Sequence, residues 1–365
     1  MKKLFFIFLA VLLSVLCSCS ERQIVISAVP PRPLDIPDIS GLLPQPEPEP
    51  LPEPEPEKPE FISELSGKGI SAEDVAKRPI AVMINNDKRS LPQSGISKAD
   101  IIFECEAEGG ATRMMALFKS FRDVGIIGTV RSARDYFIDF AQIFDAVYIH
   151  AGGSPAAYEH IKDRRINNLD GVNMYLPDCF YRDPERLKTS ALEHTLVTSG
   201  DKLYDKINAF GYRTELKESY EPSLTFAEEA YVPEGESAEY IKIPRAFPSE
   251  FNFDAQSGTY THTQYGIVQS DKETETELYF DNVILLYVSQ YPLNDDKNRI
   301  AVDFTGSGKG YFISRGKYIP VTWSRDSRDG GMTVYDGMGQ SIELNAGKTF
   351  ISIVNKAYYN TTEIR

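Results

Sequence analysis

Cysteine is scarce in this chain. Only four of its 365 residues are cysteines, and two of them, Cys17 and Cys19, lie close to the N-terminus. A framework of disulfides, as found in small secreted domains, is therefore excluded. Cys105 lies inside an apolar run, which favours a small buried residue over a redox centre. A bridge between Cys105 and Cys179 stays open, because sequence alone does not give cysteine pairing.

Positive charge is also in short supply. Lys and Arg number 39 against 53 Asp and Glu, which gives a formal net charge of -14 at pH 7. A protein this acidic repels polyanions as a whole, so we expect no nucleic acid partner. Any anionic ligand has to meet a local basic site.

Histidine is rare, and its positions indicate no metal. The four residues His150, His160, His194 and His262 lack metal-ligand spacing, so we expect neither a metal nor another cofactor. His150 lies four residues before Ser154, but no Gly-x-Ser-x-Gly elbow surrounds the serine, which argues against a serine hydrolase. Neither Cys105 nor Cys179 has the glycine-rich context of a wall transpeptidase.

The N-terminus carries an apolar run from Leu4 to Leu16 after two lysines, too short for a permanent membrane span and typical of a secretory signal. It closes on Leu16-Cys17-Ser18-Cys19, which resembles a bacterial lipobox. The resemblance implies that Cys19 is diacylated, because the small Ser18 precedes it whereas the bulky Leu16 precedes Cys17. We therefore predict a lipoprotein signal peptide over residues 1–19 and a lipid anchor, carrying palmitate-type chains, on the extracytoplasmic face of the plasma membrane. A cleaved signal with two incidental cysteines is the alternative.

Residues 20–75 are predicted to be a Pro/Glu-rich disordered spacer. Proline alternates with glutamate, as in Pro46-Glu47-Pro48-Glu49-Pro50, which favours extended polyproline II. The spacer either lifts the folded part into the cell wall or is a passive leader.

Residues 76–220 are predicted to form an α/β domain. Short apolar runs indicate strands over 80–84, 101–105, 114–118 and 146–150. Helices are expected from Ser132, from Ser154 with Pro155 at the first helical position, and over 201–210 before Gly211. Strands that alternate with helices over this length favour an α/β architecture.

Residues 240–360 are predicted to form a mostly β domain. Short strand candidates follow one another, separated by Gly, Asp and Asn turns. The acidic stretch from Glu215 to Glu239 has little periodicity and is the expected boundary. Gly306-Ser307-Gly308-Lys309-Gly310 lacks the spacing of a phosphate loop, so we interpret it as a hairpin turn.

Several motifs resemble the YerB-type lipoprotein family in order and spacing, among them Arg78 to Asn86, Glu108-Gly109-Gly110-Ala111-Thr112-Arg113, Val130 to Arg134, His150 to Pro155 and Pro320-Val321-Thr322-Trp323. The resemblance covers nearly the whole chain after the spacer. It implies two domains of unknown function, of the DUF3048 type, on a lipoprotein, and it names no reaction. One departure is at Val268, where a histidine is expected nearby.

Basic residues concentrate between Gly109 and Arg134, where five Lys and Arg face Asp123 alone. Arginines near helix starts are typical of phosphate or carboxylate sites, because free N–H groups and guanidinium groups then converge. The anion-binding candidates are Arg113, Arg131, Ser132, Arg134, Gly152, Gly153 and Ser154, with Asn85, Asn86, Glu108 and His150 as secondary polar candidates. If the two strand-to-helix turns share one sheet edge, they form a pocket there. Alternatively the arginines form structural salt bridges with Glu104, Glu106, Glu108 and Asp135.

These features predict a cell-envelope lipoprotein that binds an anionic envelope ligand or adapts a wall enzyme. Its expected partners are the plasma membrane through the lipid anchor, and a cell-wall polymer, a lipid pyrophosphate or an envelope enzyme. The alternative is an extracytoplasmic phosphotransferase-like enzyme acting on a lipid-linked wall polymer precursor. That alternative rests on an analogy of site chemistry with wall-polymer ligases of the LytR-CpsA-Psr type. Whether the chain is catalytic stays open.

Overall fold

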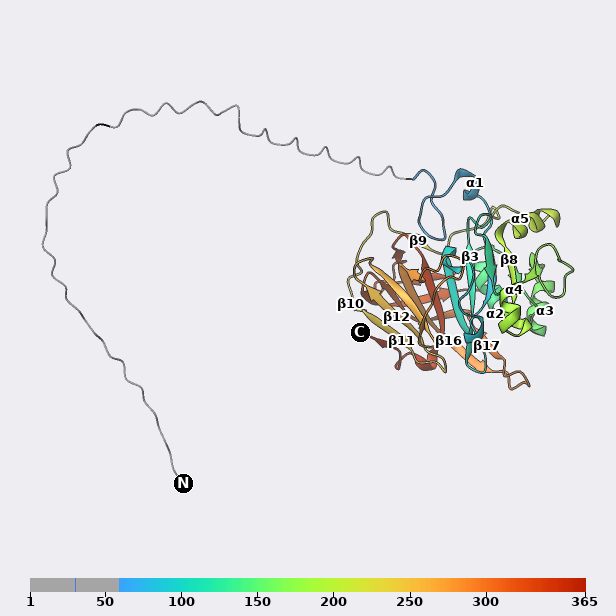
Figure 1. Ribbon diagram of the computed structural model, residues 1–365. Coiled ribbons are helices and arrows are strands. Elements are labelled where there is room, and N and C mark those ends of the chain that lie inside the picture. The colour runs from blue at the N-terminus through green and yellow to red at the C-terminus, as the bar shows by residue number, and fades with distance from the viewer. Residues whose placement is uncertain (1–29, 31–58) are drawn as a thin grey trace, which may run out of the picture. The chain divides into compact units, whose positions relative to one another are not determined.

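The computed structural model describes Pro30 and residues 59–365 (Figure 1). The predicted signal peptide, the lipidation site Cys19 and most of the predicted spacer lie outside the described residues. Within residues 59–365 no helix is both long and apolar enough to cross a bilayer.

A 12-stranded sheet runs through the folded unit. Ten strands follow one another across it: β10 (Glu236–Ser237), β19 (Lys317–Arg325), β18 (Gly306–Ser314), β16 (Asn282–Pro292), β22 (Thr349–Asn355), β2 (Ile101–Glu108), β3 (Ala111–Phe118), β1 (Ile80–Asn85), β5 (Val147–His150) and β6 (Asn168–Asp170). Off this path, β17 (Ile300–Asp303) pairs with β16, and β20 (Thr333–Tyr335) pairs with β19. The sheet therefore combines strands from both halves of the chain.

Strand β22 joins the two halves. It lies between β2 and β16 and runs parallel to both, with Phe103 opposite Ile351 and Ile284 opposite the same residue on the other side. Its first six residues are buried, as expected for a strand covered on both faces.

Helices cover parts of both faces of this sheet. They are α1 (Ala72–Val75), α2 (Asp135–Ile143), α3 (Pro155–Asp163), α4 (Pro184–Thr189) and α5 (Gly200–Ala209), with 3-10 turns η1 (Lys88–Ser90), η2 (Ile96–Lys98), η3 (Leu192–His194) and η4 (Lys356–Tyr358). On one face, Phe140 of α2 stacks on Phe103 at 5.2 Å between ring centroids. On the other face, Leu203 and Ile207 of α5 join the core with β1 and β5. Alternate strand residues thus fill two separate cores.

Smaller sheets complete the fold. A six-stranded sheet comprises β14 (Ile267–Val268), β13 (Thr259–Gln264), β12 (Ser249–Asp254), β11 (Tyr240–Ile243), β23 (Glu363–Ile364) and β15 (Tyr279–Phe280). It packs on the same face of the large sheet as α5, through Phe251 against Phe350. The remaining strands pair as β4 (Ile126–Gly128), β8 (Leu196–Ser199) and β7 (Tyr181–Arg182), and as β21 (Glu343–Leu344) with β9 (Thr225–Phe226).

The fold class is confirmed: an α/β N-terminal region precedes a mostly β C-terminal region. The four N-terminal strands, the helix after Ser154 and the helix before Gly211 lie where the sequence predicts them, within a few residues. Cys105 and Cys179 are both buried and free, so no bridge joins them.

The helix predicted from Ser132 begins later, at Asp135, and Arg134 precedes it without a side-chain cap. Residues before it are held as extended backbone, because Ala133 bridges Gly153 and the Arg131 N–H donates to the Met83 carbonyl at 2.9 Å. Ser132 is therefore not the helix cap.

Two further expectations are corrected. The predicted spacer extends too far, since Leu65 is fully buried in the core and Ile62 pairs with Gly69. Gly306 to Gly310 is not a hairpin turn but the first half of strand β18. A side chain at Gly308 would place its Cβ 2.6 Å from Trp323 Nε1, so glycine there lets the indole pack on the strand.

The acidic stretch from Glu215 to Glu239 is attached to both halves. Glu215 bridges Lys77 and the Lys217 N–H donates to Asp145, whereas the later residues contact the C-terminal half. Its strands β9 and β10 pair with β21 and β19, and Leu224 is buried. Pairing explains why weak periodicity in the sequence does not make this stretch a free linker.

Candidate functional site

The carboxyl ends of several strands meet at one edge of the large sheet. Strands β1, β5 and β6 are parallel, and β2 runs the same way because β1 and β2 are both antiparallel to β3. This edge collects polar residues, namely Asn85 at the end of β1 and Asn86 just after it, Glu108 at the end of β2, His150 at the end of β5 and Asp170 at the end of β6. Such edges are the usual ligand sites of α/β sheets.

The two predicted turns lie side by side at this edge. The Ala151 N–H donates to the Arg131 carbonyl and the Ala133 N–H donates to the Gly152 carbonyl, both at 2.9 Å. The structure therefore brings together the segments 131–134 and 151–154, which the anion-site hypothesis requires.

Glu108 lies between two arginines. Its Oε2 is 2.9 Å from Arg113 Nη2, and its Oε1 accepts from the Arg134 guanidinium. Arg113 also donates to the Ser132 carbonyl, and Arg134 to the Ala133 carbonyl. We call Glu108, Arg113, Arg131 and Arg134 the arginine cluster.

Arg131 completes this cluster with a separate partner. Its guanidinium lies 3.1 Å from the carboxylate of Glu193, a side chain that is 49% exposed. Burial and the neighbouring Arg134 lower the pKa of Arg113 to about 10, against the attraction of Glu108, and Arg131 lowers it further. The three guanidinium groups thus outnumber the two carboxylates, Glu108 and Glu193, that pair with them.

The predicted helix-start groups serve the fold instead. The Ser154 hydroxyl caps α3 by accepting from the Ala157 N–H at 3.2 Å, and the Gly152 N–H donates to Asp170 Oδ1 at 2.7 Å. Gly152 has a φ of +76°, and Gly153 packs against the Tyr158 ring. The N–H groups of Gly152 and Ser154 are therefore already bonded, and recognition of an anion would depend mainly on the arginines.

His150 holds the turn after β5. The ring is fully buried, with Nδ1 2.8 Å from the Gly152 carbonyl and Nε2 3.1 Å from Asn168 Oδ1. Both nitrogens face oxygen atoms of the fold, which suits a positioning side chain.

No group of three or more His, Cys, Asp or Glu side chains among residues 59–365 is arranged to hold a metal ion.

Comparison with known proteins decides the family. The N-terminal domain of the family "Protein of unknown function (DUF3048)" matches residues 65–213, and its C-terminal domain matches residues 240–351. The chain is 30% identical over 294 residues to "Putative lipoprotein YerB" of Bacillus subtilis (strain 168), which covers 80% of this chain and 85% of that protein. The chain belongs to the DUF3048 family. The crystal structure of YerB from Bacillus subtilis superimposes with a TM-score of 0.73 at 27% identity, covering 84% of this chain and 99% of that chain.

This DUF3048 chain also places residues at the edge that the sequence analysis passed over. His194 is fully buried, with Nδ1 2.9 Å from Asn85 Nδ2 and Nε2 3.4 Å from Glu193 Oε1. Burial lowers the pKa of His194, against the attraction of Asp87 and Glu193, which favours the neutral ring. Asn85, His194, Glu193 and Arg131 thus form one chain of contacts. The sequence signal was the pair Glu193-His194 just before an apolar strand.

The alternative expectation was that the arginines form structural salt bridges with Glu104, Glu106, Glu108 and Asp135. Of these carboxylates, Glu108 pairs with the arginines. Among the described residues, no ion pair joins Glu104, Glu106 or Asp135 to the arginine cluster. Glu104 instead lies 2.5 Å from Arg245, with both side chains fully buried. Burial would raise the pKa of Glu104, but Arg245 and the Ser249 hydroxyl hold that pKa below its usual value.

Asn86 belongs to this second network and not to the arginine cluster. Its Nδ2 donates to Thr112 Oγ1 at 2.7 Å, and its backbone carbonyl accepts from the Tyr265 hydroxyl at 2.6 Å. The DUF3048 fold therefore separates the secondary candidates. Asn85, Glu108 and His150 lie at the carboxyl edge, where Glu108 is partly exposed, and Asn86 lies in a buried junction between the sheets.

Proposed function

We propose that this chain is a lipid-anchored extracytoplasmic protein that binds a phosphate- or carboxylate-bearing envelope ligand through Arg113, Arg131 and Arg134. The observation that carries the proposal is that one carboxylate, Glu108, serves two guanidinium groups. Among residues 59–365, the ion-pair partner of Arg131 is the half-exposed Glu193 alone.

Electrostatics support this proposal. The three arginines of the cluster contribute three positive charges, whereas Glu108 and Glu193 contribute two negative ones. This local excess of positive charge lies in a chain whose formal net charge is -14. Guanidinium groups that are partly shielded from water bind oxyanions through paired, charge-assisted hydrogen bonds. An entering phosphate would replace Glu193 on Arg131 and share Arg113 and Arg134 with Glu108.

Binding fits the geometry better than group transfer. The Ser154 hydroxyl caps a helix and the His150 ring is held by two oxygens, so neither is arranged as a nucleophile or its base.

The test is calorimetry of the full chain in detergent with inorganic pyrophosphate as the probe. Arg131→Ala is expected to weaken binding by roughly tenfold or more, the usual effect of a hydrogen bond to a charged group. Glu108→Gln is expected to strengthen binding, because it removes the competing carboxylate. Arg315→Ala, which removes an arginine outside the cluster, is the matched control.

Absence of pyrophosphate binding in both the parent and Glu108→Gln would contradict the proposal. If the parent binds, an undecaprenyl pyrophosphate carrier then tests whether lipid-linked ligands bind more tightly. Turnover of that carrier would favour the phosphotransferase-like function instead.

Anchoring is tested separately. Cys19→Ala is expected to abolish labelling by a fatty-acid probe and to release the protein from membranes, since stable anchoring needs two acyl chains. Labelling that survives Cys19→Ala and disappears in Cys17→Ala would assign the anchor to the other cysteine.

A further inference from the structure

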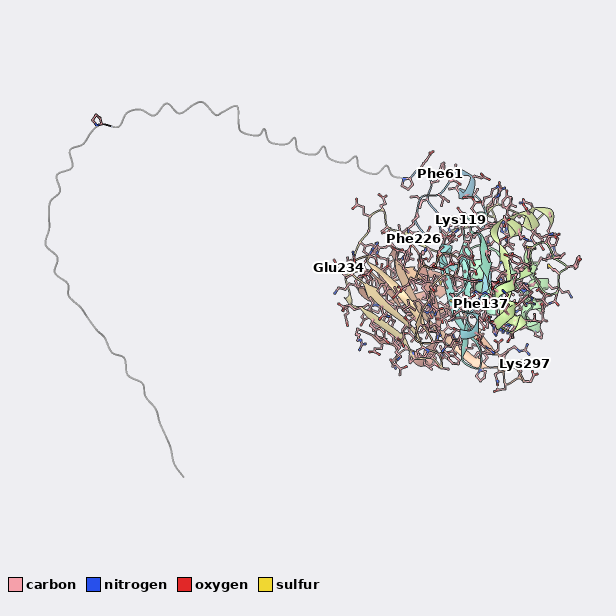
Figure 2. The ribbon with its side chains drawn as sticks, viewed as in Figure 1. Phe61, Lys119, Phe137, Phe226, Glu234 and Lys297 are labelled. Atoms are coloured by element: carbon pink, nitrogen blue, oxygen red, sulfur yellow. The ribbon has the colours of Figure 1, made fainter. Side chains whose placement is uncertain are left out.

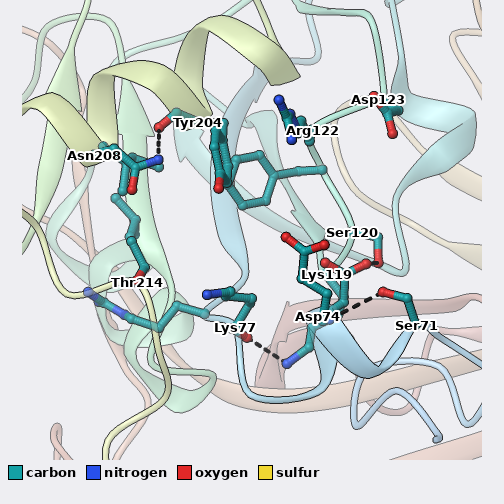
Figure 3. Close-up of a pocket in the computed structure, with 15 residues that line it drawn as sticks. Ser71, Asp74, Lys77, Lys119, Ser120, Arg122, Asp123, Tyr204, Asn208 and Thr214 are labelled. Carbon is teal, nitrogen blue, oxygen red and sulfur yellow. Dashed lines mark hydrogen bonds between the residues drawn. The ribbon is translucent and has the colours of Figure 1, made fainter.

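A cavity of ≈340 Å³ lies at the sheet edge opposite the arginine cluster (Figure 3). Its walls come from α1, from α5, from the starts of β1 and β5, and from residues 119–123 after β3. Figure 2 shows the two edges at opposite ends of the unit, with Lys119 at one and Lys297 at the other. Lys297 lies in the β16–β17 hairpin. The backbone of Arg299 in this hairpin forms a β-bridge with Glu108 of the arginine cluster. This cavity is therefore distinct from the proposed anion site.

The floor of the cavity is apolar. Phe121, Val147 and Ile207 are buried there, and the Tyr204 ring lies 6.3 Å from the Phe121 ring. A volume of this size and an apolar floor with a few polar groups are typical of small-molecule sites.

Two cations in the walls are committed to the fold. Lys119 Nζ lies 2.6 Å from Glu64 and also donates to the Lys77 carbonyl. Arg78 donates to the Asp145 carbonyl at 2.6 Å and to Asn167 at 2.7 Å. These side chains shape the cavity and are not available to a ligand.

Arg122 differs from them. Its guanidinium lies over the Tyr204 ring, 4.8 Å from the centroid, and is exposed. Within residues 59–365 it has no hydrogen bond or ion pair to a protein group. It therefore presents all its N–H donors at one side of the cavity, beside an aromatic face.

Carboxylates lie on the other side. In Figure 3, Ser71 and Asp74 of the α1 region are seen across the hollow from Arg122 and Tyr204. Asp74 Oδ2 accepts from the Ser120 hydroxyl at 2.6 Å, which leaves Oδ1 to a ligand. Glu73 lines the same side and, among the described residues, has no ion-pair partner. Asp123 lines the cavity on the side of Arg122, and Lys77, 3.9 Å from Glu215, lines it on the side of Asp74. Across the apolar floor, Arg122 with Asp123 therefore faces Asp74 and Glu73 with Lys77.

We propose that this cavity binds a small zwitterion with an apolar side chain, that is, an amino acid or a dipeptide. The ligand carboxylate pairs with Arg122, the ammonium group with Asp74 and Glu73, and the side chain packs on Phe121, Tyr204 and Ile207. A simple anion or a simple cation would satisfy only one side and leave the other unpaired.

The test titrates the full chain with four probes in calorimetry. L-phenylalanine carries both charges and a ring, hydrocinnamate lacks the ammonium, phenethylamine lacks the carboxylate, and glycine lacks the ring. L-phenylalanine is expected to bind at least tenfold more tightly than each of the others, because a charge-assisted hydrogen bond contributes roughly tenfold or more. Equal binding of hydrocinnamate, or no binding of L-phenylalanine, overturns the proposal.

Variants locate the site. Arg122→Gln is expected to reduce L-phenylalanine affinity at least tenfold and to leave the affinity for phenethylamine, which has no carboxylate, unchanged. Asp74→Asn is likewise expected to reduce L-phenylalanine affinity and to leave the affinity for hydrocinnamate, which has no ammonium group, unchanged. Asn208→Trp, from the wall on α5, should abolish binding, whereas Asp205→Trp on the exposed side of the same helix should not. Binding that survives Asn208→Trp with its affinity unchanged overturns the assignment to this cavity. Pyrophosphate binding, measured on the same variants, tests the arginine cluster independently.

Discussion

At the scale of single residues, His262 is held in an environment that disfavours its charged form. The ring is fully buried and stacks on Phe251 at 4.9 Å, and the Phe350 ring lies tilted against it at 4.8 Å. Neither ring nitrogen has a hydrogen-bond partner among the described residues. Burial lowers the pKa of His262 to about 4, against the attraction of Glu104. The folded state therefore requires the neutral ring.

Acid should destabilise the protein through this residue. Between pH 6.5 and about 4 the unfolded chain binds a proton at His262 and the folded chain does not, so the free energy of unfolding falls as the pH falls. The contribution of His262 to that fall is about 2 kcal/mol between pH 7.5 and pH 5. His262→Phe should remove it, as urea unfolding at the two pH values would measure. His160→Gln, on the surface, should leave the wild-type pH dependence, and an unchanged dependence in His262→Phe would contradict the argument.

Contacts between charged residues were predictable from the sequence where the interacting residues lie close together in the chain. Glu108, Arg113 and Arg134 lie within 27 residues, and the local excess of arginine identified the cluster. The pair Glu104 and Arg245 was not predictable, because its members are separated by 141 residues and meet only after two sheets pack together. Composition carries no information on such contacts.

At the scale of elements, strand β18 depends on a glycine that the sequence analysis placed in a turn. An added Cβ at Gly308 would lie 2.6 Å from Trp323 Nε1 and 2.7 Å from the Tyr287 carbonyl, two atoms that are hydrogen-bonded to each other at 3.2 Å. Gly308→Ala is therefore expected to lower the free energy of unfolding by about 1–3 kcal/mol, the usual cost of overpacking.

Chemical denaturation with Trp323 fluorescence measures this loss. The control is Gly337→Ala, because an added Cβ there meets no atom within 4 Å and should change stability by less than about 0.5 kcal/mol. Equal effects of the two substitutions would show that backbone entropy, and not the indole contact, explains the glycine.

Elements were predicted best where local chemistry decides them. Ser154 followed by Pro155 gave the start of α3, because capping and a fixed φ act within one turn. The start of α2 was misplaced since Ser132 has the capping side chain, yet pairing with residues 151–153 keeps the backbone extended to Arg134. Tertiary pairing overrides a cap signal of this size.

At the scale of the whole molecule, the two halves share the large sheet. We expect one cooperative unfolding transition, because β22 is hydrogen-bonded to β2 of one half and β16 of the other. Proteolysis in the exposed stretch around residues 217–222 should leave fragments that elute together in native gel filtration and separate only in denaturant. Fragments that separate without denaturant, or two resolved transitions in calorimetry, would show that the halves are independent.

The sequence predicted the class of each half but not their joining. A mostly β second half was evident from short strands and turns, whereas nothing in the pattern of 349–355 indicates that this strand pairs with residues 101–105. Register between strands so far apart is set by complementary packing of both faces.

The position of β22 in the chain also limits the order in which the strands of the large sheet can pair. The strand that completes the centre of the sheet comprises Thr349–Asn355 and lies near the end of a chain of 365 residues. In a chain made from its N-terminus, β2 therefore precedes by 248 residues the strand that pairs with its free edge. Contacts of such long sequence separation form slowly. We therefore expect the pairing of β2 with β22 to be among the late steps of folding.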